Sequence, residues 1–449
     1  MTKEVETLAS FVHERDYYDL SSEVVLALKI RILDSLACAI GALNSPVISM
    51  LKKQLDDFGG TALTTRIGGG KTSPDRAAFY NSALVRYLDF NDSFLAKNET
   101  CHPSDNLGAV LAACEYSKNT GKDLLTALAI SYQVQCRLSE VAPVRKKGFD
   151  HTTQGSFAVA AGVAKALNLS EIQTAHAISM AAVANNALRV TRTGALSHWK
   201  ALAYPNTAFS ATHAAFLAMR GVTGPLEIFE GNKGFKDAIS GPFSIDWQAE
   251  NLEIVLKTII KKYNAEIHSQ SVLEGILELR NRLGFSPDAI DSISVDIFDV
   301  AYNIIGGGEE GSKKLIRTKE EADHSLPYMI AVAICDGMVM PSQYQADRIK
   351  KKDVQELLQK VQVHPNEAYT KRFPEEMPAH ITIKFKDGTS AISEKRDYQG
   401  FFTKPFDWDE AVKKFEAIAP GNKEIQQAVL HLDSIKVTDL TTLLEKVGK

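Results

Sequence analysis

The first 260 residues contain a series of alanine-rich segments that are apolar on most of their faces. Residues 24–41, VVLALKIRILDSLACAIG, space apolar side chains at i, i+3, i+4 and i+7, which predicts a helix. Similar segments follow at 124–142, 156–169, 171–188 and 207–221. Helices that are apolar nearly all round belong in the interior of a large bundle. Gly41 is expected just past the end of the first helix, where a left-handed residue commonly stops one.

The pattern changes after about residue 285. Residues 292–300, SISVDIFDV, alternate apolar and polar side chains, as a strand does, and residues 380–395 do so twice around Asp387-Gly388. The second pattern predicts a hairpin. The sequence therefore predicts a mainly α protein with a smaller α+β domain. A helical domain spans 1–267, an α+β lid domain spans 268–400, and a C-terminal helical segment at 401–449 rejoins the helical domain.

Composition excludes several classes of protein. Apolar residues make up 45% and charged residues 24%, as in ordinary globular proteins. Lys and Arg number 51 against 55 Asp and Glu, without long basic blocks, so we expect no nucleic-acid partner. We find neither a signal peptide nor an apolar run of about 18 residues, and expect a cytoplasmic protein with no membrane partner. The cysteines lack metal-ligand spacing and are expected to be buried free thiols: Cys38, Cys101, Cys114, Cys136 and Cys335.

The segment GGGKTS at 68–73 invites comparison with a phosphate-binding loop. Such a loop needs a glycine where this chain has Thr65, and Pro74 follows one step beyond the expected start of the helix. We therefore expect a glycine-rich turn and no nucleotide.

Titratable residues concentrate in DFNDSFLAKNETCHPSD, residues 89–105, directly before an apolar segment. Ser104 is expected to cap the following helix, and Asp105 suits its first turn. Asp89, Asp92, Ser93 and His102 have no such structural explanation, and catalytic residues are often mounted on loops held by a rigid scaffold.

The same arrangement, a polar cluster before an apolar helix, recurs four times along the chain. Helix N-termini pointing at one cavity would bind an anion, and lysines there would suit a substrate with several carboxylates. Histidine titrates near neutrality and is a candidate base. The ionisable and polar residues of these clusters include His151, His198, Lys200, Lys261, Lys262, Glu266, His268, Gln270, Asp323, His324, Ser325 and Tyr328.

Five segments together resemble one known family. They are DFNDSF with HPSDNLGAVLA, GFDHTTQGSFAVAAGVAKALNL, WKALAYPNTA through FLAMRGVTGPLEIFEGNKGF, KKYNAEIHSQS, and ADHSLPYMIAVAI. In this order they resemble the MmgE/PrpD family of 2-methylcitrate dehydratases and cis-aconitate decarboxylases. The resemblance covers nearly the whole chain. It implies a homodimer of two-domain subunits, with the active site between the domains and neither a metal nor an organic cofactor.

The family's site residues fall on seven positions of this chain: Asp89, Ser93, His102, His151, Lys200, Lys261 and Tyr328. We predict catalytic roles for Asp89, His102, His151, Lys200 and Tyr328. Substrate binding is predicted for Ser93, Lys261 or its neighbour Lys262, His268 and Gln270.

The chain departs from the family pattern in places. Ser93 replaces the usual Thr but keeps the hydroxyl, Asn264 stands where Pro is common, and Ala203 and Pro205 replace His and Gly after Lys200. The AEIHSQ and ADHSLPY segments look closer to the dehydratase branch. The resemblance therefore implies a cofactor-independent dehydratase of 2-methylcitrate or another citrate-like acid. The alternatives are a cis-aconitate decarboxylase, an iminodisuccinate-type epimerase, and a non-catalytic carboxylate-binding protein.

Overall fold

The computed structural model describes residues 3–194 and 196–448. Its contacts divide the chain into two compact units. We call the first the helical unit; it comprises Met1–Thr191, Ala201–Ile260 and Phe406–Lys449. The second, the mixed unit, comprises Arg192–Lys200 and Lys261–Pro405. The short segment that ends at Lys200 is thus grouped with residues that follow Ile260.

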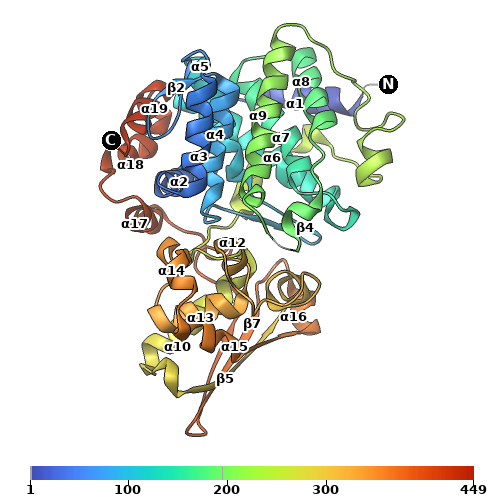
Figure 1. Cartoon of the computed structure of the whole chain (residues 1–449). Helices are drawn as coiled ribbons and strands as arrows, with labels where there is room; N and C mark the ends of the chain where they lie inside the picture. The colour runs from blue at the N-terminus through green and yellow to red at the C-terminus, as the bar shows by residue number, and fades with distance from the viewer. Residues whose placement is uncertain (1–2, 195, 449) are drawn as a thin grey trace. The chain divides into compact units, whose positions relative to one another are not determined.

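The helical unit is built from long helices drawn in blue and green, together with the C-terminal helices in red (Figure 1). Its helices are α1 Glu4–Glu14, α2 Ser22–Ala42, α3 Pro46–Phe58, α4 Pro74–Tyr87, α5 Leu107–Tyr116, α6 Gly121–Val141, α7 Thr152–Ala166, α8 Glu171–Ala184, α9 Trp199–Met219, α17 Trp408–Ile418, α18 Lys423–Leu430 and α19 Val437–Lys446. The first two residues of α9 fall in the mixed unit.

Side chains next to the helix ends explain where several helices begin. The Ser21 hydroxyl accepts a hydrogen bond from the Val24 amide at the start of α2, at 3.2 Å. Thr120 with Asp123 and Ser170 with Gln173 form reciprocal capping pairs at α6 and α8. These bonds satisfy amides that have no partner within the helix.

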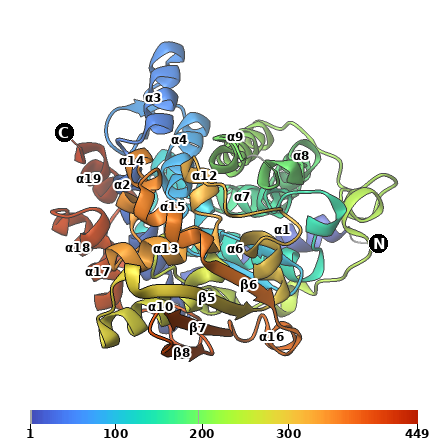
Figure 2. The same ribbon diagram turned by 60° about the horizontal axis from the view of Figure 1, so that its bottom comes forward.

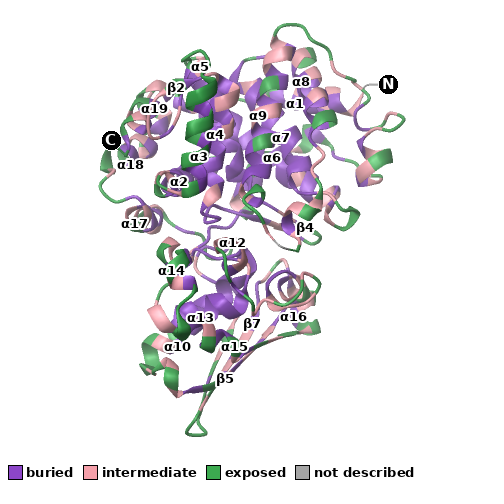
Figure 3. Ribbon diagram, viewed as in Figure 1, coloured by how far each residue is buried: buried purple, intermediate pink, exposed green. Residues whose placement is uncertain are grey.

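The central helices pack closely because they are rich in small residues. A Cβ atom on Gly162 of α7 would lie 1.9 Å from the Ser131 hydroxyl of α6, and one on Gly155 would lie 2.5 Å from the Tyr204 ring of α9. Both contacts are too short for any side chain. Figure 3 shows that buried residues concentrate on α6 and α7, as expected for helices that are apolar on most faces.

The expected role of Gly41 is wrong. Helix α2 continues to Ala42, so Gly41 lies within it. A Cβ atom there would lie 2.5 Å from a methyl group of Ile418 on α17. The glycine is therefore explained by the close approach of a C-terminal helix, which local sequence does not reveal.

Two short hairpins complete the helical unit. Strands β1 Thr64–Thr65 and β2 Lys71–Thr72 pair antiparallel, and Gly68, Gly69 and Gly70 between them all have positive φ. The GGGKTS segment is therefore the glycine-rich turn that was expected. Strands β3 Phe94–Ala96 and β4 Glu99–Cys101 form the second hairpin.

The mixed unit contains a four-stranded sheet in the order β6-β5-β7-β8. Its strands are β5 Ile290–Ile297, β6 Val361–Pro365, β7 Ala379–Phe385 and β8 Ser390–Lys395. Its helices are α10 Gln270–Leu283, α11 Asp299–Ala301, α12 Lys319–Ala322, α13 Leu326–Asp336, α14 Ala346–Ile349, α15 Lys352–Gln359 and α16 Glu367–Arg372. Strand β5 runs parallel to β6 and antiparallel to β7.

The predicted hairpin is confirmed as β7 and β8, which pair antiparallel around Asp387-Gly388. On β5, Ile293 and Val295 are buried where the alternation placed them. Helix α10 packs against β7 and β8 and α13 against β6 (Figure 2). The structure confirms the predicted fold class.

Cys335 is half-buried and the other four cysteines are buried free thiols. None of the helices in the described part of the chain is both long and apolar enough to cross a membrane.

Candidate active site

His102 lies at the end of the second hairpin, in the helical unit, and is 8% exposed. Its Nδ1 atom lies 2.8 Å from the backbone oxygen of Asp92 and 3.0 Å from the Ser93 hydroxyl. A carbonyl oxygen only accepts hydrogen bonds, so Nδ1 carries the proton. In the neutral ring the lone pair then lies on Nε2, which is the form a general base requires.

The backbone around His102 is held by buried polar groups. The Asp92 carboxylate accepts hydrogen bonds from the Tyr132 hydroxyl at 2.7 Å and from the Ser104 amide at 3.1 Å. Burial raises the pKa of Asp92, and these hydrogen bonds oppose the increase. Ser93 is tied to Ile259 by two backbone hydrogen bonds of 2.8 and 2.9 Å. The carbonyl that orients His102 is therefore fixed from both sides.

Ser104 does not cap a helix, contrary to expectation. A 3-10 helix, η2 Pro103–Asn106, precedes α5, and no side chain caps either one. The Ser104 hydroxyl instead accepts a hydrogen bond from Asn91 at 2.8 Å. Pro103 fixes the backbone dihedral angle at the first position of this turn, so the chain enters the helix through 3-10 geometry without a capping side chain.

Asp89 follows α4 with a left-handed backbone, φ 54°. Such a conformation is uncommon for residues other than glycine, although Asp tolerates it better than most. The side chain is buried and pairs with Arg86, at 2.6 Å from Nη1. The strain and the ion pair together fix the position of a carboxylate in the same loop as Ser93.

His151 directly precedes α7 and is 3% exposed. Its ring centroid lies 5.5 Å from that of His102, edge to face, and 6.0 Å from that of Tyr204, which stacks on it. Its Nε2 lies 3.6 Å from the Asp150 carboxylate. The helical unit thus brings the two predicted catalytic histidines together.

Tyr204 was not among the predicted site residues. Its hydroxyl lies 2.9 Å from the side-chain oxygen of Asn106 and 3.1 Å from that of Gln135. Burial raises the pKa of its hydroxyl well above the usual value. Tyr204 lies in the AYPNTA segment, but its stacking on His151 depends on how α7 and α9 pack.

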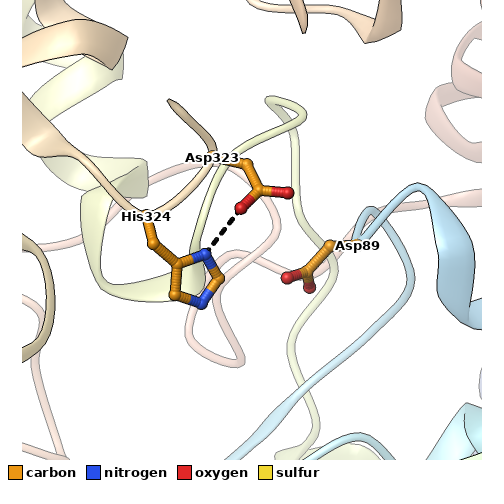
Figure 4. Close-up of side chains that lie close together, drawn as sticks. All are labelled: Asp89, Asp323 and His324. Atoms are coloured by element: carbon orange, nitrogen blue, oxygen red, sulfur yellow. Dashed lines mark hydrogen bonds and ion pairs between the residues drawn. The ribbon is translucent and has the colours of Figure 1, made fainter. Parts of the chain in front are cut away.

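Lys200 opens the polar cluster of the mixed unit. Its ammonium nitrogen lies 2.9 Å from Asp323 Oδ1 and 2.9 Å from His324 Nδ1. Asp323 Oδ1 is itself 2.8 Å from His324 Nδ1 (Figure 4). Burial would raise the pKa of Asp323, but Lys200 and Lys319 hold it far below its usual range. The cluster therefore contains a buried, ionised carboxylate between two lysines.

Glu266 and His268 form a second buried pair in the mixed unit. The Glu266 carboxylate accepts a hydrogen bond from the His268 amide at 2.8 Å and lies 2.7 Å from His268 Nδ1. Burial would raise the pKa of Glu266, but His268, His324 and Lys261 lower it to about 2. His268 is 1% exposed, and its ring lies beside those of Phe298 and Phe373.

The two adjacent lysines have different environments. Lys261 is 1% exposed and acts electrostatically on Glu266. Lys262 pairs with Glu274 at 2.9 Å, and its side chain is 38% exposed. The predicted binding residue Gln270 accepts hydrogen bonds from the Lys262 and Tyr263 amides at 2.9 and 3.0 Å. Gln270 therefore shapes the backbone that follows Lys261.

Tyr328 is fully buried in α13. Its hydroxyl donates to the backbone oxygen of Gln343 at 2.5 Å, and its amide donates to the Ser325 hydroxyl at 3.1 Å. Burial raises the pKa of Tyr328 above the usual value. The phenol proton is thus donated to a carbonyl of the mixed unit. The catalytic role of Tyr328 stays a prediction.

The predicted residues are accordingly divided between the two units. Asp89, Ser93, His102 and His151 lie in the helical unit, and the predicted lysines, His268, Gln270 and Tyr328 lie in the mixed unit. Three acidic or basic residues of the mixed unit were absent from the predicted set: Glu266, Asp323 and His324. All three lie in the AEIHSQ and ADHSLPY segments, which the sequence analysis had already singled out as polar clusters before apolar helices.

Histidines such as those of the helical unit are typical groups for proton transfer, and buried lysines such as those of the mixed unit suit an anionic ligand. Comparison with known proteins shows which family the chain belongs to. Residues 6–248 match the MmgE/PrpD N-terminal domain, and residues 263–434 match the MmgE/PrpD C-terminal domain. The chain belongs to the MmgE/PrpD family.

Individual relatives cover most of the chain. It is 28% identical to the 2-methylcitrate dehydratase of Escherichia coli (strain K12) over 83% of this chain and 81% of that protein. Identity to the mitochondrial 2-methylcitrate dehydratase of Yarrowia lipolytica is also 28%, over 86% and 78%. The cis-aconitate decarboxylase of Mus musculus is 26% identical over 92% and 86%. Family membership and the related dehydratases identify the chain as a carbon–oxygen lyase.

Proposed function

We propose that this enzyme dehydrates 2-methylcitrate, or a closely related citrate-like tricarboxylate, to the corresponding cis-aconitate without a cofactor. The observation that carries the proposal is the fixed orientation of His102, whose Nδ1 proton is directed at a backbone carbonyl. In the neutral ring the lone pair then lies on Nε2, the atom that would accept a proton. The relatives named 2-methylcitrate dehydratase support the choice of substrate.

The reaction removes a proton from a carbon next to a carboxylate and a hydroxide from the neighbouring carbon. In the proposed mechanism His102 Nε2 takes the carbon-bound proton, and the C–H electrons form the new double bond as the C–O bond breaks. His151 donates a proton to the leaving hydroxyl, which departs as water. His102 thus gains one proton and His151 loses one, so the protons balance over the reaction.

The cationic groups of the mixed unit would bind the substrate carboxylates. Lys200 and Lys261 are both buried, where charge interactions are stronger than in water. They would stabilise the negative charge that develops on a carboxylate as the proton leaves. Asp89 would orient a histidine or balance its charge, Ser93 would hold His102, and Tyr328 would contact the leaving group or a carboxylate.

The direct test is NMR of chelator-treated enzyme in deuterated water, with 2-methylcitrate, citrate and cis-aconitate supplied separately. We expect loss of water from 2-methylcitrate and incorporation of deuterium in the reverse direction. Silence with all three acids would overturn the proposal and favour the epimerase or the binding-protein alternative. Activity that returned only with added metal would contradict cofactor independence.

Variants test the roles of the two histidines. We expect His102→Gln and His151→Gln each to lower kcat/KM by at least 100-fold, as for loss of a general acid or base. His176→Gln is the matched control, because His176 is a helical-unit histidine whose Nδ1 lies 3.2 Å from the Gly224 carbonyl and is outside the cluster. A loss under tenfold in both cluster variants would contradict the assignment.

Decarboxylation is the second candidate, because the related cis-aconitate decarboxylase matches 92% of this chain. The same lysines would hold the carboxylates of cis-aconitate. The product separates the two candidates: itaconate from cis-aconitate would assign the enzyme to the decarboxylases.

A further inference from the structure

The strongest unexplained feature in the mixed unit is His268 Nε2. This atom is buried and has no hydrogen-bond partner among the described residues. A buried polar atom without a partner costs free energy, so native structures rarely keep one without a reason. The aromatic rings of Phe298 and Phe373 lie 5.6 and 5.7 Å from the His268 ring and offer it no polar partner.

The opposite side of the ring is fully engaged. Both oxygens of Glu266 bind His268, one through Nδ1 at 2.7 Å and one through the backbone amide at 2.8 Å. This two-point contact fixes the carboxylate against its own histidine. Because an ionised carboxylate only accepts hydrogen bonds, Nδ1 carries a proton. Glu266 therefore holds a proton on Nδ1 of His268.

The two oriented histidines differ in the partner of Nδ1. His102 faces a neutral carbonyl, whereas His268 faces a carboxylate that is ionised in the folded protein. A carboxylate favours a proton on both ring nitrogens, and a carbonyl does so much less. Lys261, His324 and Lys313 also interact electrostatically with Glu266. His268 is the group that lowers the pKa of Glu266 most, and its Nδ1 lies 2.7 Å from the carboxylate.

We propose that Glu266 is a positioning residue that keeps His268 charged and presents its Nε2 proton to the substrate carboxylate on which negative charge develops. The inference rests on the proposed function and assigns a purpose to the atom that lacks a partner. Glu266 touches no reacting atom; it acts through His268. The Nε2–H group then supplies a charged hydrogen bond that strengthens as the carboxylate gains charge.

Kinetics of the full-length enzyme test this role. We expect Glu266→Gln to lower kcat roughly 100-fold, the usual effect of losing one donor to a developing oxyanion, with KM changed less than about threefold. His268→Asn should have a similar effect, and the double variant should be no worse than His268→Asn alone. Additive losses in the double variant would show that Glu266 acts independently of His268 and would overturn the proposal.

The matched control is Asp397→Asn. Asp397 is a buried carboxylate of the same unit, bound to the Thr403 hydroxyl at 2.7 Å and to Lys404, without a histidine. We expect its kcat to stay near that of the unmodified enzyme. A loss equal to that of Glu266→Gln would mean that any buried carboxylate of this unit matters, which contradicts a specific role.

A second readout does not need turnover. In protein labelled with ¹⁵N-histidine, the His268 ring, assigned by its loss in His268→Asn, should show protons on both nitrogens at pH 7. Glu266→Gln should convert it to a neutral ring. A neutral ring in the unmodified protein would overturn the inference even if the dehydratase is active. A charged ring in an enzyme that is silent toward all tested acids would refute the proposed function alone.

Discussion

Single hydrogen bonds set the properties of the candidate catalytic residues. Ser93 illustrates this, because its hydroxyl lies 3.0 Å from His102 Nδ1, beside the carbonyl that already accepts from the same nitrogen. The hydroxyl is a second contact and the carbonyl is the main one. Replacing Ser93 should therefore weaken the orientation of His102 without abolishing it.

We expect Ser93→Ala to lower kcat/KM by about fivefold, which corresponds to about 1 kcal/mol for one neutral hydrogen bond. Ser93→Thr should stay within about twofold, because it keeps the hydroxyl. Steady-state kinetics of both variants check this expectation. A loss in Ser93→Thr as large as in Ser93→Ala would show that packing around Ser93 is the deciding factor.

Glu266 also links stability to pH. Its pKa is about 2 in the folded protein against 4.5 for an ordinary Glu. The stability that it contributes is therefore present above pH 4.5 and is lost as the pH falls toward 2. Between pH 5.5 and 3.5 this group alone should remove about 1.4 kcal/mol. Urea unfolding at both pH values should show that loss in the unmodified protein and its absence in Glu266→Gln; equal losses would contradict the lowered pKa.

At the scale of elements, α17 holds the loop that carries the site of the helical unit. The Lys414 ammonium on α17 lies 2.6 Å from Asp34 on α2 and donates to the Phe90 carbonyl at 2.7 Å. Burial raises the pKa of Asp34, and Lys414 opposes this. Phe90 lies between Asp89 and the Asp92-Ser93 pair, so a C-terminal residue fixes a loop more than 300 positions away.

Lys414→Met should lower the free energy of unfolding by about 3 kcal/mol, because it leaves Asp34 buried without its cation. Asp34→Asn combined with Lys414→Met should recover part of the loss. The exposed neighbour Lys413, replaced by Met, is the control and should change stability by less than about 0.5 kcal/mol. Urea denaturation of the unmodified protein and the three variants measures these changes. Equal losses of stability for the Lys413 and Lys414 variants would contradict the role of Lys414 in holding the Phe90 loop.

At the scale of the whole molecule, we propose a homodimer, as the family resemblance implies. Leu188 and Val190 are 61% and 70% exposed, and large apolar side chains exposed near each other often mark an interface. Light scattering after gel filtration should give twice the mass of one chain. A mass of one chain across the micromolar range would contradict the proposal.

Local patterns were sufficient to predict the long apolar helices, the β7–β8 hairpin and the fold class, because each depends on neighbours within a few residues. They also identified the segments that carry His102, His151, Lys200 and His268. The sequence placed Gly41 and Ser104 in helix caps, and both assignments were wrong, since Ile418 and Asn91 determine what those residues do.

The sequence by itself determined which residue types are available and on which segments they stand. Only the tertiary structure decided their partners: the Asp92 carbonyl for His102, Tyr204 for His151, and Asp323 for Lys200, 123 residues away. The reason is physical. Periodicity reports which face of an element is buried, whereas the charge and tautomer of a side chain depend on atoms that only packing brings within about 3 Å.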